Sequence, residues 1–174
     1  MHPYIQDNIV AVATPPGRGA LAIVRLSGKS LVEVYKDFTH KSPKNRYALY
    51  SKIYHPRKKN VLLDEAIITY YKSPNSFTGE DMIEISCHGG SVVKGAIVNA
   101  AIEGGARIAE PGEFSLRSFL NGKMDLIQAE AVSALISSKG RLSSEISLEH
   151  LDGKASHALK ALKLGVLDLL SIIE

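Results

Sequence analysis

The chain has 174 residues, of which 45% are hydrophobic and 22% charged, with a formal net charge of +3. This composition fits one globular domain with or without an appendage, and it is neither that of a disordered chain nor that of a membrane protein. The N-terminus does not resemble a signal peptide, and no apolar run approaches the roughly 18 residues of a membrane span. The single cysteine, Cys87, excludes an internal disulfide and suits a reducing compartment. We therefore expect a cytoplasmic protein with no membrane span.

Residues up to Pro111, which include all seven prolines, predict an α+β domain. Apolar, β-type runs predict the strands, and a short extended piece follows them at residues 107–109. A helix that Ser30 can cap is expected at residues 29–38, and an apolar helix ending at two glycines is expected at residues 91–103. The predicted strands span residues 9–13, 20–27, 46–54, 62–71 and 80–87.

The 63 residues after Pro111 contain no proline and predict helices at residues 114–120, 126–138 and 143–174. In the last helix, apolar residues recur every three or four positions and form one stripe along one face. The chain ends inside this stripe. We therefore expect either a piece of a longer protein or half of a bundle that another chain completes. The stripe consists of Leu151, Ala155, Ala158, Leu162, Val166, Leu169 and Ile173.

Two charged residues lie within otherwise apolar strands. In the segment DMIEISC, alternation places Ile83, Ile85 and Cys87 on one face and Glu84 on the other. Arg25 closes a nearly continuous apolar strand and also needs a polar partner, because an unpaired buried charge is costly. Glu84 is the natural partner within the fold. Two hypotheses stay open: a structural ion pair, or a shared pocket for a flat, polar heterocycle.

Other candidate motifs are weaker. Gly28-Lys29-Ser30 resembles the end of a phosphate-binding loop, but Ile23 stands where that loop requires a glycine. The six histidines show no metal-binding spacing, and we expect no metal site. His88 precedes two glycines, so it either fixes a turn or contacts a substrate. Lys123 follows a turn and is either a solvated lysine or a contact for an anionic ligand tail.

Residues 41–59 are rich in lysine and arginine, with tyrosines between them. Basic side chains with interleaved aromatic rings can hold an RNA backbone and stack on its bases. The same pattern is also typical of a solvated hairpin whose lysines protect the edge of a sheet. The net charge of +3 does not by itself indicate nucleic-acid binding.

Four segments resemble the N-terminal part of the MnmE (TrmE) family of tRNA modification GTPases, from about Asn8 to the last residue. They are ATPPGRGALAIVRLSG, PNSFTGEDMIEISCHGG, GARIAEPGEFSLRSFLNGKMDLIQAEAV and LDGKAS. The resemblance implies that residues 1–120 form a domain like the tetrahydrofolate-binding domain of glycine cleavage T-protein, which also mediates homodimerisation. Residues 121–174 would be the first part of a helical domain. The GTPase domain, with its GTP, Mg and K sites, and the C-terminal cysteine motif would lie outside this chain.

The resemblance also implies a function. With the flavoprotein MnmG (GidA), the family modifies C5 of the wobble uridine of tRNA, using a tetrahydrofolate one-carbon donor. A 5-formyl or 5,10-methylene tetrahydrofolate would contact Arg25, Glu84 and Lys123, and no residue of this chain would be catalytic. The chain alone would not hydrolyse GTP. Two alternatives stay open: a pure dimerisation scaffold, and a one-carbon-transfer enzyme of the T-protein kind.

Overall fold

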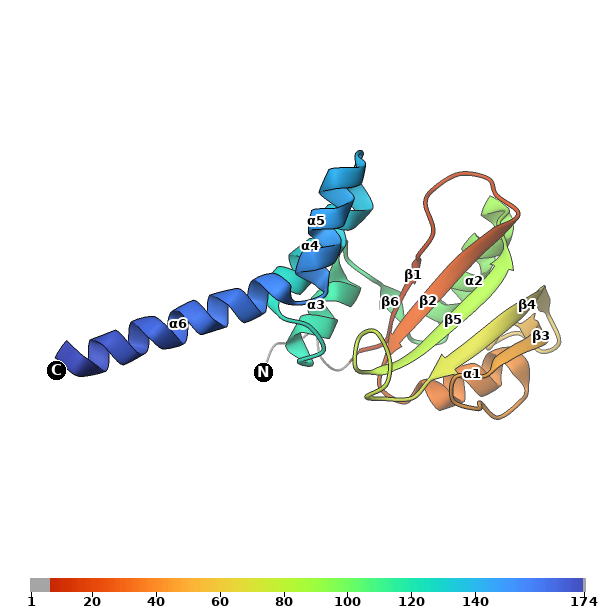
Figure 1. Ribbon diagram of the computed structural model, residues 1–174. Coiled ribbons are helices and arrows are strands. Elements are labelled where there is room, and N and C mark those ends of the chain that lie inside the picture. Colours follow the sequence, from red (N-terminus) through yellow and green to blue (C-terminus); the bar gives the residue numbers. More distant parts are fainter. Residues whose placement is uncertain (1–6, 174) are drawn as a thin grey trace. The chain divides into compact units, whose positions relative to one another are not determined.

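The computed structural model describes residues 7–173, which divide into two compact units after Arg117. The first unit has the predicted α+β architecture, built on one six-stranded sheet in the order β3-β4-β5-β2-β1-β6 (Figure 1). All neighbouring strands are antiparallel except β1 and β6. The strands are β1 (Ile9–Val12), β2 (Leu21–Gly28), β3 (Ala48–Tyr54), β4 (Leu62–Tyr71), β5 (Asp81–His88) and β6 (Arg107–Ile108).

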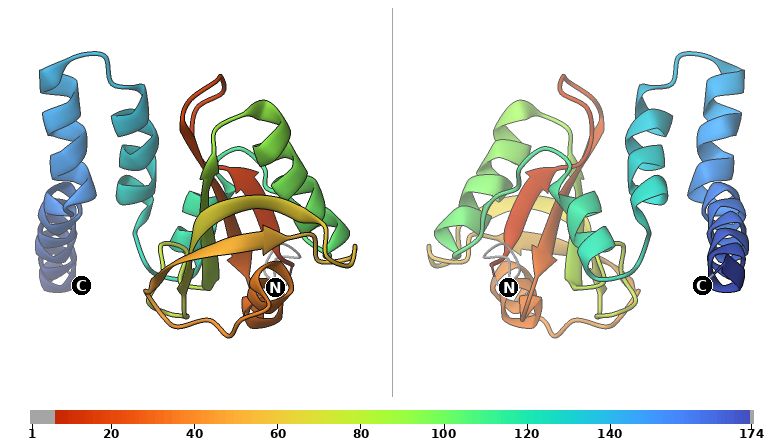
Figure 2. Two further views of the ribbon diagram at one scale, coloured as in Figure 1. Left: turned by 90° about the vertical axis from the view of Figure 1, so that its right-hand side faces the viewer. Right: turned by 90° about the vertical axis from the view of Figure 1, so that its left-hand side faces the viewer.

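One face of this sheet carries the hydrophobic core. Helices α1 (Leu31–Thr39) and α2 (Ser91–Glu103) pack on it, as two further views show (Figure 2). Strand residues that alternate along the chain, such as Val24, Ile68 and Ile85, are fully buried there. The predicted alternation in β5 is confirmed, because Ile83, Ile85 and Cys87 all belong to this core.

The opposite face, called the open face below, carries the side chains at the intervening positions. Leu21, Tyr50 and Ile67 are large hydrophobic residues on this face, and all three are exposed. Arg25 and Glu84 lie on the same face and are partly buried. The open face therefore combines exposed apolar side chains with two pairs of opposite charges, the partly buried Arg25–Glu84 and the exposed Lys52–Glu65.

The second unit consists of helices. It contains the end of α3 (Glu113–Leu120), followed by α4 (Leu126–Ser137), α5 (Arg141–Leu151) and α6 (Lys154–Ile173). Helix α4 begins with a capping box, in which Asp125 accepts from the backbone of Gln128 and Gln128 accepts from the backbone of Asp125. Within residues 7–173, no helix has the length and hydropathy to cross a membrane.

Two details of the predicted helices are wrong. Ser30 makes no side-chain capping bond, because its backbone adopts a left-handed conformation with φ 60° before α1 begins. The single helix predicted for residues 143–174 is broken into α5 and α6 at Gly153, whose φ of +88° a helix cannot contain. The apolar stripe continues across this break, so periodicity alone did not reveal it. Residue 174 and the side chains of Leu169 and Ile173 lie outside the described part.

Candidate functional site

The register of the sheet places Arg25 on β2 directly opposite Glu84 on β5. The Arg25 Nε–H donates to Glu84 Oε1 at 2.9 Å, and Arg25 Nη2 forms an ion pair with the same oxygen at 2.7 Å. The predicted partnership of these two residues is therefore confirmed. Both side chains project from the open face of the sheet, since their strand neighbours Val24 and Ile85 are in the core.

Three aromatic side chains surround this pair. The Tyr71 hydroxyl donates to Glu84 Oε2 at 3.2 Å, and burial together with the Glu84 charge raises the pKa of Tyr71. The guanidinium carbon of Arg25 lies 5.3 Å from the ring centre of Phe77 and 5.6 Å from that of Phe114. These three side chains partly cover the Arg25–Glu84 pair and leave part of it accessible to solvent.

Solvent still reaches both charges of the pair. The side chains of Arg25 and Glu84 are 25% and 22% exposed. Their mutual bonds use one edge of the guanidinium and concentrate on one carboxylate oxygen. A carboxylate can accept about four hydrogen bonds and a guanidinium can donate five, so both groups have capacity for a planar polar ligand.

A second charged cluster lies beside this pair, and the sequence reasoning missed it. Arg117, only 2% exposed, bonds Asp7 Oδ1 at 2.6 Å, Glu113 Oε1 at 3.0 Å and Glu80 Oε2 at 3.1 Å. Arg107 forms ion pairs with two of the same carboxylates: its Nη2 lies 2.6 Å from Glu113 Oε1, and its Nε lies 2.6 Å from Asp7 Oδ2. We call these five residues the buried network after its centre, since Arg117, Glu113 and Glu80 are buried, while Arg107 and Asp7 at its rim are 34% and 40% exposed.

The electrostatics of the buried network lower the pKa values of Glu113 and Asp7. Burial alone would raise the pKa of Glu113, but hydrogen bonds from Arg107, Arg117 and the Glu110 backbone outweigh it and hold the pKa at about 2. Burial also opposes the charge on Asp7, yet bonds to the same two arginines lower its pKa. The network is thus a set of compensated charges.

The buried network also positions the aromatic rings around the pair. Ser27 bonds both Glu80 Oε2, at 2.8 Å, and the Thr78 hydroxyl, at 2.6 Å. This fixes the loop that carries Phe77, while Glu113 fixes the first turn of α3, which carries Phe114. The signal in the sequence was Glu113 and Arg117, four positions apart on a short helix and so able to pair.

Lys123, the third predicted folate contact, belongs to the second unit. It is exposed, and its backbone N–H donates to the Ser118 carbonyl at 2.9 Å in the turn that ends α3. The structure therefore brings Arg25 and Glu84 together within one unit. A site that unites them with Lys123 is a proposal, taken up below.

His88 has a well-defined partner. Its ring Nδ1 lies 2.7 Å from Asp64 Oδ1, and its backbone N–H donates to Asp64 Oδ2 at 2.8 Å. The adjacent Gly89 admits the backbone of Gly19, because a Cβ at Gly89 would lie 2.4 Å from the Gly19 carbonyl oxygen. The loop before β2 thus packs directly against this glycine.

A metal site and a reactive thiol at Cys87 are two other candidate sites. Among the described residues, no group of three or more His, Cys, Asp or Glu side chains has the geometry of a metal site. Cys87 is buried in the core, and burial raises the pKa of its thiol, which disfavours the reactive thiolate. The Arg25–Glu84 pair is therefore the candidate functional site.

The fold and this pair define an α+β domain with an accessible charged site on the open face of its sheet, followed by helices. Residues 8–123 match the family described as "GTP-binding protein TrmE N-terminus". The match covers the whole sheet together with Arg25, Glu84 and Lys123. The chain therefore belongs to the TrmE N-terminal family, and the predicted resemblance is confirmed.

Three similar proteins are each named tRNA modification GTPase MnmE. The chain is 44% identical over 172 residues to a tRNA modification GTPase MnmE from Aquifex aeolicus, covering 98% of this chain. It is 42% identical to the MnmE of Fervidobacterium nodosum over 97% of the chain, and 43% identical to that of Ligilactobacillus salivarius over its full length. In each case the chain spans 38% of the relative's length.

Proposed function

We propose that this chain is the N-terminal part of a tRNA modification GTPase, and that it binds a tetrahydrofolate one-carbon donor. The name of its relatives supports the first part. The accessible, aromatic-flanked Arg25–Glu84 pair is the observation that carries the second.

The groups present fit the chemistry of a pterin. Its amino-pyrimidine edge offers two neighbouring donors, which one carboxylate such as Glu84 can accept. Arg25 then offers donors to a ring carbonyl, and the Phe77 and Phe114 rings provide flat apolar surfaces beside it. Lys123 would neutralise the glutamyl carboxylates of the folate tail. In this arrangement the folate supplies a one-carbon unit, and the residues of this chain bind and orient it.

The remaining partners follow from the same proposal. The chain would work in the cytoplasm with the flavoprotein MnmG, whose flavin would carry out the redox step, on C5 of the wobble uridine of tRNA. GTP, Mg and K would bind in the GTPase domain of the complete protein. The first unit would retain the architecture of the folate-binding domain of glycine cleavage T-protein.

Homodimerisation through the first unit is part of this proposal. Leu21, Tyr50 and Ile67 expose large hydrophobic side chains on the open face, and contiguous apolar surface of this kind is typical of interaction sites. Light scattering of the chain in solution should give twice the mass of 18.8 kDa. A monomer at all concentrations would contradict the dimer while leaving folate binding to its own test.

Isothermal titration with 5-formyl-tetrahydrofolate tests the folate proposal. We expect binding by the chain, loss of binding in Glu84→Ala and weaker binding in Lys123→Ala. Glu65→Ala is the matched control, because Glu65 is an exposed carboxylate on the neighbouring β4 that pairs with Lys52. Equal binding by Glu84→Ala and Glu65→Ala would contradict the assigned site.

The same experiment separates the alternatives. A dimeric chain that binds no folate would be a dimerisation scaffold, with Arg25 and Glu84 as a structural ion pair. Turnover of a one-carbon folate by the chain alone would favour a T-protein-like transfer enzyme. GTP hydrolysis should not exceed the buffer rate, since Ile23 replaces the glycine that a phosphate loop requires. Phosphate release that depends on magnesium or potassium would contradict this expectation.

A further inference from the structure

Between Asp37 and Asp64 the chain contains no carboxylate side chain. The same 26 residues hold seven lysines and arginines and two histidines. Since the whole chain has a net charge of only +3, its remaining residues are net acidic. The positive charge of this protein is therefore concentrated in the segment that forms β3 and its flanking turns.

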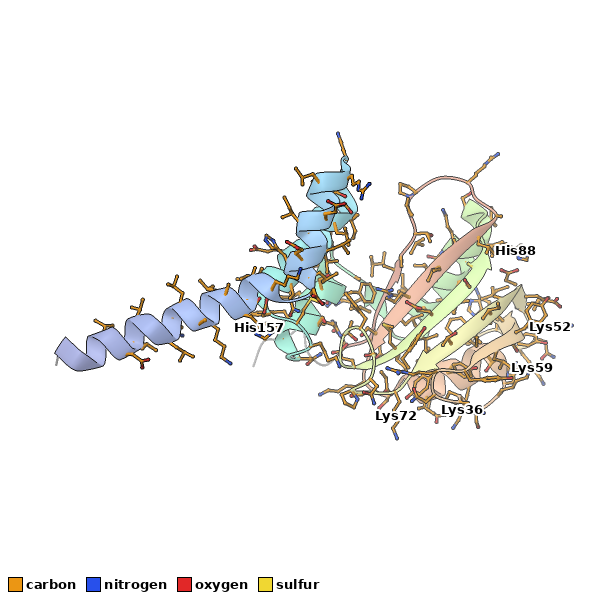
Figure 3. The ribbon with its side chains drawn as sticks, viewed as in Figure 1. Lys36, Lys52, Lys59, Lys72, His88 and His157 are labelled. Carbon is orange, nitrogen blue, oxygen red and sulfur yellow. The ribbon has the colours of Figure 1, made fainter. Side chains whose placement is uncertain are left out.

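The fold places this segment at one boundary of the sheet, because β3 is the outermost strand. The start of β3 lies beside the end of β4: the Arg46 N–H donates to Tyr70 O at 2.8 Å, and the Lys72 N–H donates to Asn45 Oδ1 at 2.9 Å. Lys72 thus joins the cations of the segment. We call the basic edge the set Lys44, Arg46, Lys52, Lys58, Lys59 and Lys72, of which Lys52, Lys59 and Lys72 are labelled in Figure 3.

Intramolecular partners leave most of this charge available. Lys52 reaches Glu65 only at 3.9 Å and Lys58 reaches Glu103 at 3.4 Å, and all four side chains are largely exposed. Exposed ion pairs of this kind contribute about 0–1 kcal/mol, so an incoming phosphate can displace them. Arg46 donates to a backbone carbonyl, of Asn75, at 3.1 Å and keeps its full charge.

Exposed aromatic rings lie among these cations. The Lys44 ammonium sits 5.0 Å from the ring centre of Tyr47, which is 51% exposed. Tyr50, 66% exposed, projects from β3 on the open face, where its hydroxyl donates to Glu65 at 2.9 Å and its ring belongs to the apolar surface proposed for the dimer. Lysines alone suffice to protect a sheet edge. The Tyr47 ring beside them adds the stacking surface that an unpaired nucleotide uses.

We propose that the basic edge binds the sugar–phosphate backbone of tRNA, with Tyr47 as a stacking surface for an unpaired base. This inference rests on the proposed function, because it assumes that the complete protein acts on tRNA. It adds the surface through which this part of the chain contacts that substrate. An acidic protein would satisfy the charges, but it gives no reason for the exposed Tyr47 ring, which favours RNA.

Fluorescence anisotropy with a labelled, unmodified tRNA transcript tests the proposal on the whole chain. We expect Lys44→Ala, Lys59→Ala and Lys72→Ala combined to weaken binding about tenfold or more. The slope of log affinity against log salt should also fall by about 2 to 3, since each lysine accounts for roughly one phosphate contact. The matched control combines Lys29→Ala, Lys139→Ala and Lys160→Ala, three exposed lysines outside the basic edge with the same loss of charge.

The control should keep the wild-type salt slope. Equal losses in the two triple variants would overturn the proposal, because net charge alone would then explain binding. Absence of tRNA binding by the wild-type chain, or tighter binding to polyglutamate than to tRNA, would also overturn it. Folate titration of the same samples separates the two claims: a triple variant that binds folate normally leaves the folate site intact whatever its affinity for tRNA.

Discussion

The first unit contains two arginine–carboxylate clusters that serve different ends. In the buried network, Arg117 and Glu113 are each 2% exposed, and Arg117 is shared among three carboxylates. In the Arg25–Glu84 pair, both side chains stay about a quarter exposed and their bonds concentrate on one oxygen. The centre of the first cluster is buried and multiply bonded, and only its outer members Arg107 and Asp7 reach solvent, at 34% and 40% exposed. The second cluster has no buried centre, and both of its members have spare donors or acceptors.

This difference separates a structural cluster from a binding site. Charges that are buried and fully paired stabilise one conformation, and removing one partner leaves the others uncompensated. When a charge that remains in contact with solvent loses its partner, water solvates it and the fold loses little stability. Such a charge can also exchange its partner for a ligand. Mutations in the buried network should therefore lower the stability of the fold strongly. Mutations in the Arg25–Glu84 pair should instead weaken ligand binding and change stability little.

The largest effect is expected for Arg117→Met, which leaves Glu80 and Glu113 buried without their shared cation. We expect the free energy of unfolding to fall by about 3–5 kcal/mol, measured by urea denaturation. Arg141→Met is the matched control, since Arg141 forms a fully exposed pair with Glu145, and its change should stay within about 0.5 kcal/mol. Similar losses in both variants would contradict the distinction between buried and exposed clusters.

Acid should act mainly on the buried network. The pKa of Glu113 is about 2 in the folded chain against 4.5 for the free group, so its contribution is complete above about pH 5 and disappears as the pH falls toward 2. This shift corresponds to about 3 kcal/mol, and the lowered pKa of Asp7 acts in the same direction. Urea denaturation at several pH values should show this loss.

Glu113→Gln provides the control for the acid effect. The variant should be less stable near neutral pH, because Arg107 and Arg117 lose a charged partner. Its stability should also change less between about pH 5 and pH 3 than that of the wild type. A Glu113→Gln variant with an unchanged pH profile would assign the acid sensitivity to other carboxylates.

The smallest effect on stability is expected at the open pair. Glu84→Ala should lower the free energy of unfolding by about 1 kcal/mol or less, because solvent can still reach Arg25 and two aromatic rings flank it. Urea denaturation measures this change on the protein used for folate titration. A loss as large as that of Arg117→Met would mean that the pair is structural.

The alternation of residues along β2 and β5 was sufficient to predict the strands, their buried faces and the partnership of Arg25 with Glu84. Such pairing follows from side-chain direction in neighbouring strands, which a sequence contains directly. The buried network could not be predicted in this way. Its members come from the N-terminal segment, the loop before β5, β6 and α3, and only the tertiary fold brings Asp7, Glu80 and Arg117 together.

The helical region shows the converse limit. Apolar periodicity continues through Gly153, so the pattern favoured one helix where a left-handed glycine separates α5 from α6. At Ser30 the residue type was right for a cap, but the backbone conformation was not. Periodicity identifies which face of an element is buried more reliably than it identifies where the element ends.

The most direct test of the central claim is a nuclear magnetic resonance titration of the chain with 5-formyl-tetrahydrofolate, following the Arg25 Nε–H resonance. This proton now points to Glu84 at a donor–acceptor distance of 2.9 Å, so a ligand that takes over the carboxylate must move its signal. We predict a saturable shift of Arg25 Nε–H, with the Arg117 Nε–H signal unchanged. Folate binding that leaves the Arg25 signal in place would contradict the assignment of the open pair as the binding site.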